Sequence, residues 1–324
     1  MKTPHLTRRT LLAAALTAPA FKAHAQSFPD RALRLVVPYS AGGGTDIVGR
    51  LVGQDMEQTL GQPVIIENKP GANTAIGANY VARSQPDGYT LYFGGASSLV
   101  VPPLVSPQLN IKPEEFAPVS LVLKQPYALG VSPEFASNLD EVVKKLRADP
   151  DKYSFGHTGV GGIGHLIGVR LMNATKTSMI SVTYRGFQQT VIDVMTDRIA
   201  MTFEAVNNFL PYLAEGRVRL VAVSSEKRLP QLPDVPTFAE AGYPDMVVES
   251  WLGVFAPAGT PKPIIDRLNQ AVLHAVASEK FKEAAARAVQ QPMSSTPEEL
   301  AVFMRDDIAA WRKVIEPLHL PTNN

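Results

Sequence analysis

Apolar residues and turn residues alternate along this chain in a pattern that predicts successive strands and helices. Leu33–Val37 is an apolar, β-rich run, and Thr45–Leu60 then repeats apolar residues on one helical face. Two further strand-like runs, Pro63–Glu67 and Tyr89–Phe93, flank a helical stretch at Thr74–Arg83. This βαβαβ order predicts a parallel sheet.

A second series of the same kind starts near residue 127. We expect its strands and helices at Tyr127–Val131, Leu139–Ala148, Tyr153–Phe155, Gly164–Asn173, Ile180–Tyr184, Gln188–Thr196, Ile199–Phe203 and Val218–Ser224. A strand at Leu252–Phe255 is expected to return the chain to the first series, before helices at Lys262–Ala277, Glu279–Val289 and Pro297–Ile315. The pattern therefore predicts two α/β lobes, residues 26–126 with 250–324 and residues 127–249. Each lobe would hold a parallel-rich sheet flanked by helices, with a ligand cleft between the lobes and a hinge at the two crossings.

The first 25 residues have the layout of a signal peptide. A basic start is followed by the apolar run Leu11–Phe21 and by a small-residue site that ends at Ala25. The pair Arg8-Arg9 resembles a twin-arginine signal, although basic residues also precede the apolar run of general signals. An uncleaved anchor is disfavoured because spanning needs about 20 apolar residues. We expect cleavage after Ala25 and a periplasmic protein.

Composition narrows the classes of function. The 324 residues suggest about two domains. Without the first 25 residues the chain keeps 27 basic and 30 acidic residues and has no basic run, so we expect neither nucleic acid nor an anionic membrane surface as a partner. Cysteine is absent, which excludes disulfides, thiolate catalysis and cysteine-ligated metals.

A glycine-rich turn joins the first predicted strand to the first predicted helix. The first turn of a helix presents unpaired N–H groups and a partial positive charge, so such a turn can hold a carboxylate without a cationic side chain. The lysine and hydroxyl residue of a P-loop are missing. The alternative is a tight turn in which the acid merely favours the helix dipole. The candidate ligand-binding residues of this turn are Tyr39, Ser40, Ala41, Gly42, Gly43, Thr45 and Asp46.

A second glycine-rich turn, at residues 155–165, contains G-x-G-x-x-G, which is also a dinucleotide fingerprint. Tyr184-Arg185 stand where an acid would hold the ribose of NAD, so NADP stays open and an exported NADP-dependent oxidoreductase is the alternative function. Export to a compartment with little free nicotinamide disfavours it, and we expect no cofactor. The candidate ligand-binding residues here are His157, Thr158, Gly159, Gly161, Gly162 and His165, with Tyr184 at the end of the next strand.

Other candidate residues carry less information. Ser97 and Ser98 follow a strand at the edge where open-sheet sites form, although serines are also common in polar turns. Arg185 is either a carboxylate partner or a surface residue, and the surface is favoured. A metal pair of His157 and His165 lacks nearby acids with ligand spacing, so we expect no metal. No hydrolase, zinc-protease or kinase motif occurs, and we expect no enzyme.

Four segments carry a resemblance to a known family. Pro38–Asp46, Gly61–Gly71, Pro86–Leu91 and Leu232–Gly242 resemble the tripartite tricarboxylate transporter substrate-binding proteins, also called Bug receptors. The likeness covers nearly the whole chain after residue 25. It implies a two-lobed periplasmic binding protein that holds a small carboxylate at the glycine turns, partly through ordered waters, and that has integral membrane transporter subunits as partners. We expect a monomer, and a receptor that feeds a sensor kinase is the remaining alternative.

The second turn departs from the family pattern. His157 replaces a serine and Gly162 replaces a hydroxyl residue, while His165 is kept. Glu204 stands where an aspartate is common. Because an imidazole can stack on a flat ring, with Tyr39 as a second aromatic face, we hypothesise a dicarboxylate, including an aromatic one such as terephthalate, over a citrate-like ligand.

Overall fold

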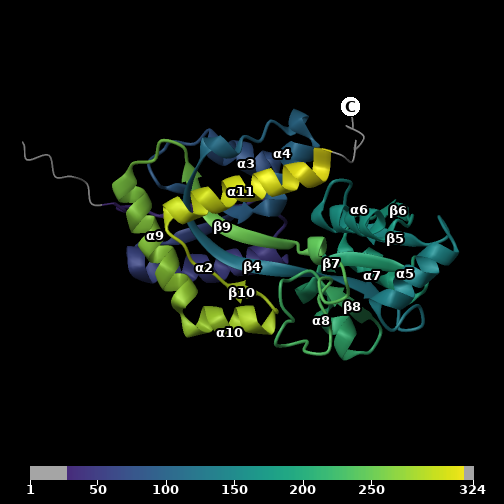
Figure 1. Ribbon diagram of the computed structural model, residues 1–324. Coiled ribbons are helices and arrows are strands. Elements are labelled where there is room, and N and C mark those ends of the chain that lie inside the picture. Colours follow the sequence, from purple (N-terminus) through teal and green to yellow (C-terminus); the bar gives the residue numbers. More distant parts are fainter. Residues whose placement is uncertain (1–27, 317–324) are drawn as a thin grey trace, which may run out of the picture.

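The computed structural model describes residues 28–316, so the predicted signal peptide lies outside the described residues. The described chain forms one mixed ten-stranded sheet flanked by helices, with the main strand order β2-β1-β3-β9-β4-β7-β5-β6. Two halves are visible along this sheet, joined by the long strands β4 (Phe116–Val131) and β9 (Glu249–Pro257) (Figure 1). This agrees with the predicted fold class of two α/β lobes.

The first half follows the predicted βαβαβ order. Its elements are β1 (Leu33–Val37), α2 (Gly44–Leu60), β2 (Val64–Asn68), α3 (Ala75–Ala82) and β3 (Thr90–Gly95). Strand β1 lies between β2 and β3 and pairs in parallel with both. Neighbouring β1 side chains point to opposite faces, so Leu35 and Val37 enter the core under α2 while Val36 enters the core under α3.

Strand β4 changes its partners in the middle. Residues 116–126 pair with β9 in the first half. In the second half, Tyr127–Val131 pair with β7 (Met201–Ala205) and Ala128–Val131 pair with β8 (Arg219–Val223). The prediction began this strand at Tyr127 and missed its first part. Pro118 and Pro126 interrupt the apolar pattern there, and register shifts accompany the paired segment.

The second half holds the parallel strands of the second series. Its elements are α5 (Leu139–Ala148), β5 (Ser154–His157), α6 (Ile163–Thr175), β6 (Ile180–Thr183), α7 (Phe187–Met195) and α8 (Val206–Ala214). Strand β5 pairs in parallel with β6 and β7, whereas β4 is antiparallel to β7 and β8. Helix α8 was not predicted, because it is short and contains Pro211.

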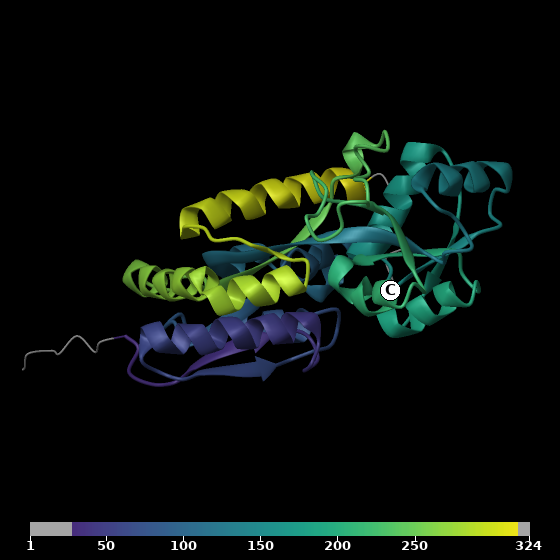
Figure 2. The same ribbon diagram turned by 90° about the horizontal axis from the view of Figure 1, so that it is seen from below.

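The C-terminal helices pack on the first half. They are α9 (Lys262–Ala277), α10 (Glu279–Arg287) and α11 (Pro297–Ile315), and the two-residue strand β10 (Gln291–Pro292) pairs with β4 between them. Helix α9 packs with α2 on one face of the sheet, and α11 packs with α3 on the other. Figure 2 shows α9 and α10 (yellow-green) beside α2 (purple). Within residues 28–316, no helix combines the length and apolar character needed to cross a membrane.

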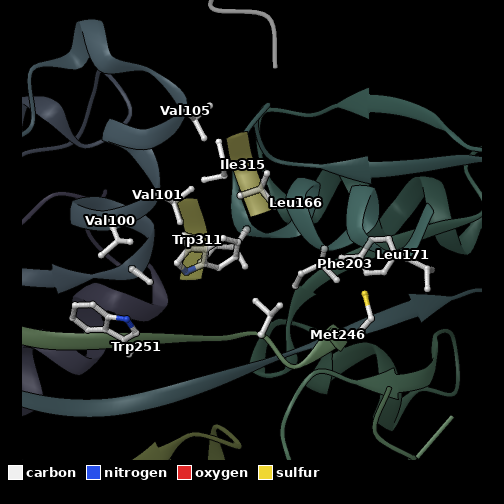
Figure 3. Packing of buried hydrophobic residues seen from close by; sticks show 14 of the residues in the cluster. Val100, Val101, Val105, Leu166, Leu171, Phe203, Met246, Trp251, Trp311 and Ile315 are labelled. Carbon is white, nitrogen blue, oxygen red and sulfur yellow. The ribbon is translucent and has the colours of Figure 1, made fainter. Parts of the chain in front are cut away.

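Apolar side chains connect the halves beside α11. Four short helical elements lie between β3 and β4: η2 (Ala96–Val100), α4 (Val101–Val105), η3 (Pro107–Leu109) and η4 (Pro113–Glu115). A fifth, η5 (Pro244–Met246), precedes β9. Side chains of α4, α6 and the last turns of α11 gather in one buried cluster (Figure 3). We call this cluster the apolar seam, which consists of Val101, Val105, Leu166, Trp311 and Ile315.

Candidate functional site

A cleft of about 700 Å³ lies between the two halves. Both glycine turns contribute to its wall, together with residues from the crossing strands and from α8. Its lining residues are Tyr39, Gly44, Thr45, Asn73, Ser97, Ser106, Leu109, Gln125, Tyr127, Thr158, Gly159, Val160, Gly162, Ile163, Gly164, Glu204, Asn207, Asn208, Ser250 and Leu252. Among these residues, Glu204 is the single one with an acidic or basic side chain. The starts of helices α2 and α6 therefore face one largely uncharged space.

Asp46 fixes the first glycine turn from inside. Its side chain is buried and accepts hydrogen bonds from the Gly42 N–H (2.8 Å), from Asn68 Nδ2 (2.8 Å) and from Arg50 Nε (2.9 Å). Burial alone would raise the pKa of Asp46, but the hydrogen bonds from Arg50, Gly42 and Asn68 hold it below its usual value. Asp46 is not among the lining residues, so its position favours a structural role in the turn.

The remaining residues of that turn divide into two groups. Tyr39 and Thr45 line the cleft, and so does Gly44, which opens α2. The residues between them, Ser40, Ala41, Gly42 and Gly43, are exposed but do not line the cleft. The first-turn amides of α2 have no acceptor within the helix. They can therefore donate to an anion that enters beside Gly44 and Thr45.

The second glycine turn is shaped by two close approaches. Gly161 has φ +77°, and a Cβ there would lie 2.2 Å from Val105 Cγ1 in the other half. At Gly164 a Cβ would lie 2.3 Å from the carbonyl oxygen of Phe203 on β7. Two of the three glycines of the fingerprint thus serve packing. Thr158, Gly159 and Gly162 line the cleft, whereas Gly161 is buried.

The two histidines of this turn face the core. His157 is 2% exposed, its Nε2 lies 2.7 Å from Ser181 Oγ, and its Nδ1 accepts from the Gly159 N–H. His165 Nδ1 accepts from the Gly161 N–H, and the two ring centroids lie 4.6 Å apart. Burial lowers the pKa of His157, and burial together with His157 lowers the pKa of His165 to about 4. Both rings are therefore neutral at pH 7 and brace the turn without lining the cleft.

The described chain offers no metal centre around these histidines. Across residues 28–316, no group of three or more histidine, cysteine, aspartate or glutamate side chains is placed to hold a metal ion.

Tyr39 and the serines after β3 form one polar corner. Tyr39 Oη lies 3.0 Å from Ser97 Oγ, and both residues line the cleft. Burial raises the pKa of Tyr39, so its phenol stays protonated at neutral pH. Ser98 is fully buried, and its Oγ accepts from the Gly95 N–H at 2.9 Å. Of the two predicted serines, only Ser97 can reach a molecule in the cleft.

Tyr184 and Arg185 lie outside the cleft. The Tyr184 hydroxyl donates to Asp193 Oδ2 at 2.8 Å, and burial, with Asp193, raises the pKa of Tyr184 to about 12. Arg185 is exposed and lines a neighbouring hollow of about 480 Å³, which shares Asn207 and Asn208 with the cleft. The position that would read a ribose in a dinucleotide-binding protein is thus separate from the space between the glycine turns.

Several lining residues were not predicted, and among them are three side-chain amides near the strand crossing. Gln125 Nε2 donates to Asn207 Oδ1 at 3.2 Å, and Gln290 Nε2 donates to Gln125 Oε1 at 3.3 Å. Asn207 Nδ2 donates to Asn208 Oδ1 at 3.3 Å, which extends this row of amides to α8. Asn207 and Asn208 follow the carboxyl end of a predicted strand, where open-sheet sites form, and that position was the available signal.

Asn73 enters the cleft from a strained loop. Ala72, Asn73 and Thr74 have φ values of 45°, 46° and 73°, a left-handed run that is rare for residues other than glycine. The sequence gives no periodic signal for such a loop, so its contribution was not predicted.

Glu204 lies where β7 ends and α8 begins. Its side chain is half-buried, and its Oε1 accepts from the Ala205 N–H at 2.8 Å. Burial raises the pKa of Glu204 to about 7, although the Ala205 N–H and the Asn208 side chain act in the opposite direction. The carboxyl of Glu204 therefore exchanges its proton near neutral pH.

Known proteins resemble this chain over nearly its full length. The family model described as tripartite tricarboxylate transporter family receptor matches residues 48–320. The structure of the periplasmic binding protein BugD is 32% identical, covers 90% of this chain and 98% of its own, and superposes with a TM-score of 0.79. MatC (Rpa3494) from Rhodopseudomonas palustris with bound malate is 31% identical, with coverage of 89% and 100% and a TM-score of 0.79.

A further solved relative carries a longer ligand. Rpa4515 from R. palustris with adipate is 30% identical, with coverage of 89% and 97% and a TM-score of 0.81. The family match extends over more than half of the chain, and the structural matches share its two-lobed α/β arrangement. The chain therefore belongs to the tripartite tricarboxylate transporter receptor family, a family of solute-binding receptors that includes periplasmic binding proteins.

Proposed function

We propose that this protein binds a small dicarboxylate in the cleft between its halves and delivers it to membrane subunits of a tripartite tricarboxylate-type transporter. The observation that carries the proposal is the meeting of two helix starts, at Gly44 and Ile163, in one cleft. Helix starts offer oriented N–H donors and partial positive charge to an anion. We further propose export to the periplasm, with cleavage after Ala25, and a monomeric protein.

The lining supports recognition by main-chain and neutral side-chain donors. No lysine or arginine is among the lining residues, while Thr45, Ser97, Thr158 and Asn208 offer hydroxyl or amide groups. A hydrogen bond to a charged group contributes about 1.5–3 kcal/mol. Several such bonds suffice for a carboxylate without an ion pair.

The ligands of two relatives and the aromatic residues of the cleft bear on the length and shape of the ligand. Two relatives hold the aliphatic dicarboxylates malate and adipate. The suggestion of an aromatic diacid depended on His157, whose ring is directed into the core, so its remaining support is the rings of Tyr39 and Tyr127. We therefore favour an aliphatic dicarboxylate over terephthalate and over citrate.

Ligand capture requires that the halves move relative to each other. We propose lobes of residues 26–126 with 250–324 and of residues 127–249, hinged where β4 changes partners at Pro126 and Tyr127. An anion contacts both helix starts only when the lobes approach, so ligand favours the closed state. Small-angle scattering should give a smaller radius of gyration with saturating ligand, and an unchanged profile would contradict lobe closure.

A calorimetric screen tests the ligand class. Malate, adipate, citrate and terephthalate are titrated into the mature protein, and adipate or malate should bind most tightly. Gly44→Val should weaken binding at least tenfold, because a Cβ there lies 3.4 Å from Asn207 Nδ2 and larger groups enter the cleft. Arg185→Ala, outside the cleft, is the control and should change affinity less than threefold. Tight binding of citrate or terephthalate alone would refute the aliphatic assignment.

A further inference from the structure

Glu204 is an acid in a cleft that we assign to an anion. It is the single acidic or basic side chain among the residues that line this cleft. Its own donors are the Ala205 N–H and the Asn208 side chain, and no cation contributes to its environment. An ionised Glu204 would therefore repel the ligand, and the cleft wall has no cationic side chain to offset that repulsion.

The packing of β7 against α6 brings Glu204 close to the anion position. A Cβ on Gly164 would lie 2.3 Å from the carbonyl oxygen of Phe203, so the residue after Phe203 lies beside the start of α6. Both Gly164 and Glu204 line the cleft. A carboxylate that accepts from the first amides of α6 is consequently a neighbour of the Glu204 carboxyl group.

We propose that the cleft binds its ligand carboxylate together with one proton, which Glu204 holds in a carboxyl–carboxylate hydrogen bond with the ligand. This inference depends on the proposed dicarboxylate function and names the residue that sets its specificity. The proton comes from the solvent, no other bond is made or broken, and it returns to the solvent when the ligand leaves. A protonated Glu204 is both uncharged and a donor, so the same proton removes the repulsion and adds a contact.

The side chains that face Glu204 do not change their protonation state between pH 6 and 9, so Glu204 is the residue that titrates in this range. Tyr127 on β4 and Tyr39 after β1 are the nearby phenols, and burial raises the pKa of each, so both remain protonated between pH 6 and 9. Asn207 and Asn208 on α8 do not ionise. On α6, His165 packs against Phe155 in the core, away from the cleft lining.

The direction of the pH dependence follows from linkage. Burial holds the pKa of Glu204 near 7 in the free protein, and a ligand anion beside it raises that pKa further. Below about pH 7 Glu204 is already protonated, so binding takes up little additional proton. Above it the proton must be taken from the solvent, and the dissociation constant should rise toward tenfold per pH unit.

Calorimetry with adipate tests the inference. Adipate is titrated into the wild-type protein from pH 6 to 9, in two buffers of different ionisation enthalpy, which gives the number of protons taken up. We expect close to one proton at pH 8.5 and a small fraction at pH 6. Glu204→Gln should abolish the uptake and bind adipate more tightly than wild type at pH 9. Glu249→Gln is the matched control, because burial also raises the pKa of Glu249 but that residue does not line the cleft.

The outcomes distinguish a failure of the proposed role of Glu204 from a failure of the proposed ligand class. Adipate binding without proton uptake, or with uptake that survives in Glu204→Gln, overturns the role of Glu204 and leaves the proposed function standing. Failure of adipate to bind at any pH contradicts the proposed ligand class instead. In that case carbon-13 titration of glutamate carboxyls, assigned by loss of one signal in Glu204→Gln, decides the inference: a midpoint near 7 supports it, and one near 4.5 overturns it.

Discussion

We expect Asp46→Ala to damage the first glycine turn and, through it, ligand binding. The mutation leaves three donors without their acceptor: the Gly42 N–H, Asn68 Nδ2 and Arg50 Nε. Hydrogen bonds to a charged acceptor contribute about 1.5–3 kcal/mol each, but the half-exposed Arg50 adds little because water replaces its partner. The bonds from Gly42 and Asn68 together therefore predict a loss of about 3–6 kcal/mol in the free energy of unfolding, measured by urea denaturation.

Ligand affinity distinguishes damage to this turn from a general loss of stability. Without Asp46 the turn loses the bond that fixes Gly42, so adipate affinity measured by calorimetry should fall at least tenfold. Asp55→Ala is the matched control, because Asp55 is also buried on α2 and accepts from Ser278 Oγ at 2.6 Å, far from the cleft. That control should lose stability with affinity unchanged within twofold. Equal affinities in the two variants would refute the view that Asp46 positions the anion site.

Three further changes test the packing around the cleft. Gly161→Val combines an unfavourable positive φ with a clash against Val105, so urea denaturation should show a loss of about 2–4 kcal/mol, and Val105→Ala should restore only the steric part. Folding lowers the pKa of His165 from 6.5 to about 4, so the unfolded chain takes up a proton first as the pH falls. His165 should therefore leave the free energy of unfolding unchanged above pH 6.5 and lower it between pH 6.5 and 4, by up to about 1.4 kcal/mol per pH unit. His165→Asn should reduce this slope in urea titrations. Trp311→Ala removes a large side chain of the apolar seam and should cost about 3–5 kcal/mol; an unchanged urea midpoint would show that the seam adds no stability.

Local sequence patterns were sufficient to predict the positions of most helices. The predicted bounds of α5, α9 and α11 match those observed, because each helix has an amphipathic repeat and a clear start. Helix α11 begins with Thr296 as N-cap and Glu299 as its partner in a capping box. Signals of this kind lie within a few residues of each other, so they can be read without knowledge of the tertiary structure.

Strand β4 and helix α8 could not be found in this way. The first part of β4 is stabilised by pairing with β9, more than a hundred residues away in sequence, and two prolines hide it locally. Helix α8 is held against β4 and β7 rather than by its own propensity. In both cases tertiary contacts override a weak or contrary local signal.

The candidate site shows the same contrast between local sequence signals and tertiary contacts. The two glycine turns were recognisable because each follows a strand and opens a helix, and the structure brings both to one cleft. Which way a side chain points was not recognisable. His157 and Ser98 lie in the same segments as lining residues, but each faces inward to satisfy a neighbouring backbone group. Buried polar groups need partners, and the partner decides the direction.

Under the proposed function, the use of main-chain donors would link affinity to the relative position of the halves. The start of α2 belongs to one half and the start of α6 to the other, while a Cβ on Gly44 would lie 3.4 Å from Asn207 Nδ2 across the cleft. If the halves separate as proposed, each helix start would return to water and would bind an anion only through its own few amides. A lysine in the cleft would attract the anion in both states and would weaken this dependence. We therefore expect the absence of lysine and arginine from the lining to favour release on opening, and introduction of a lysine at Thr45 should slow dissociation more than it speeds association in stopped-flow measurements with adipate.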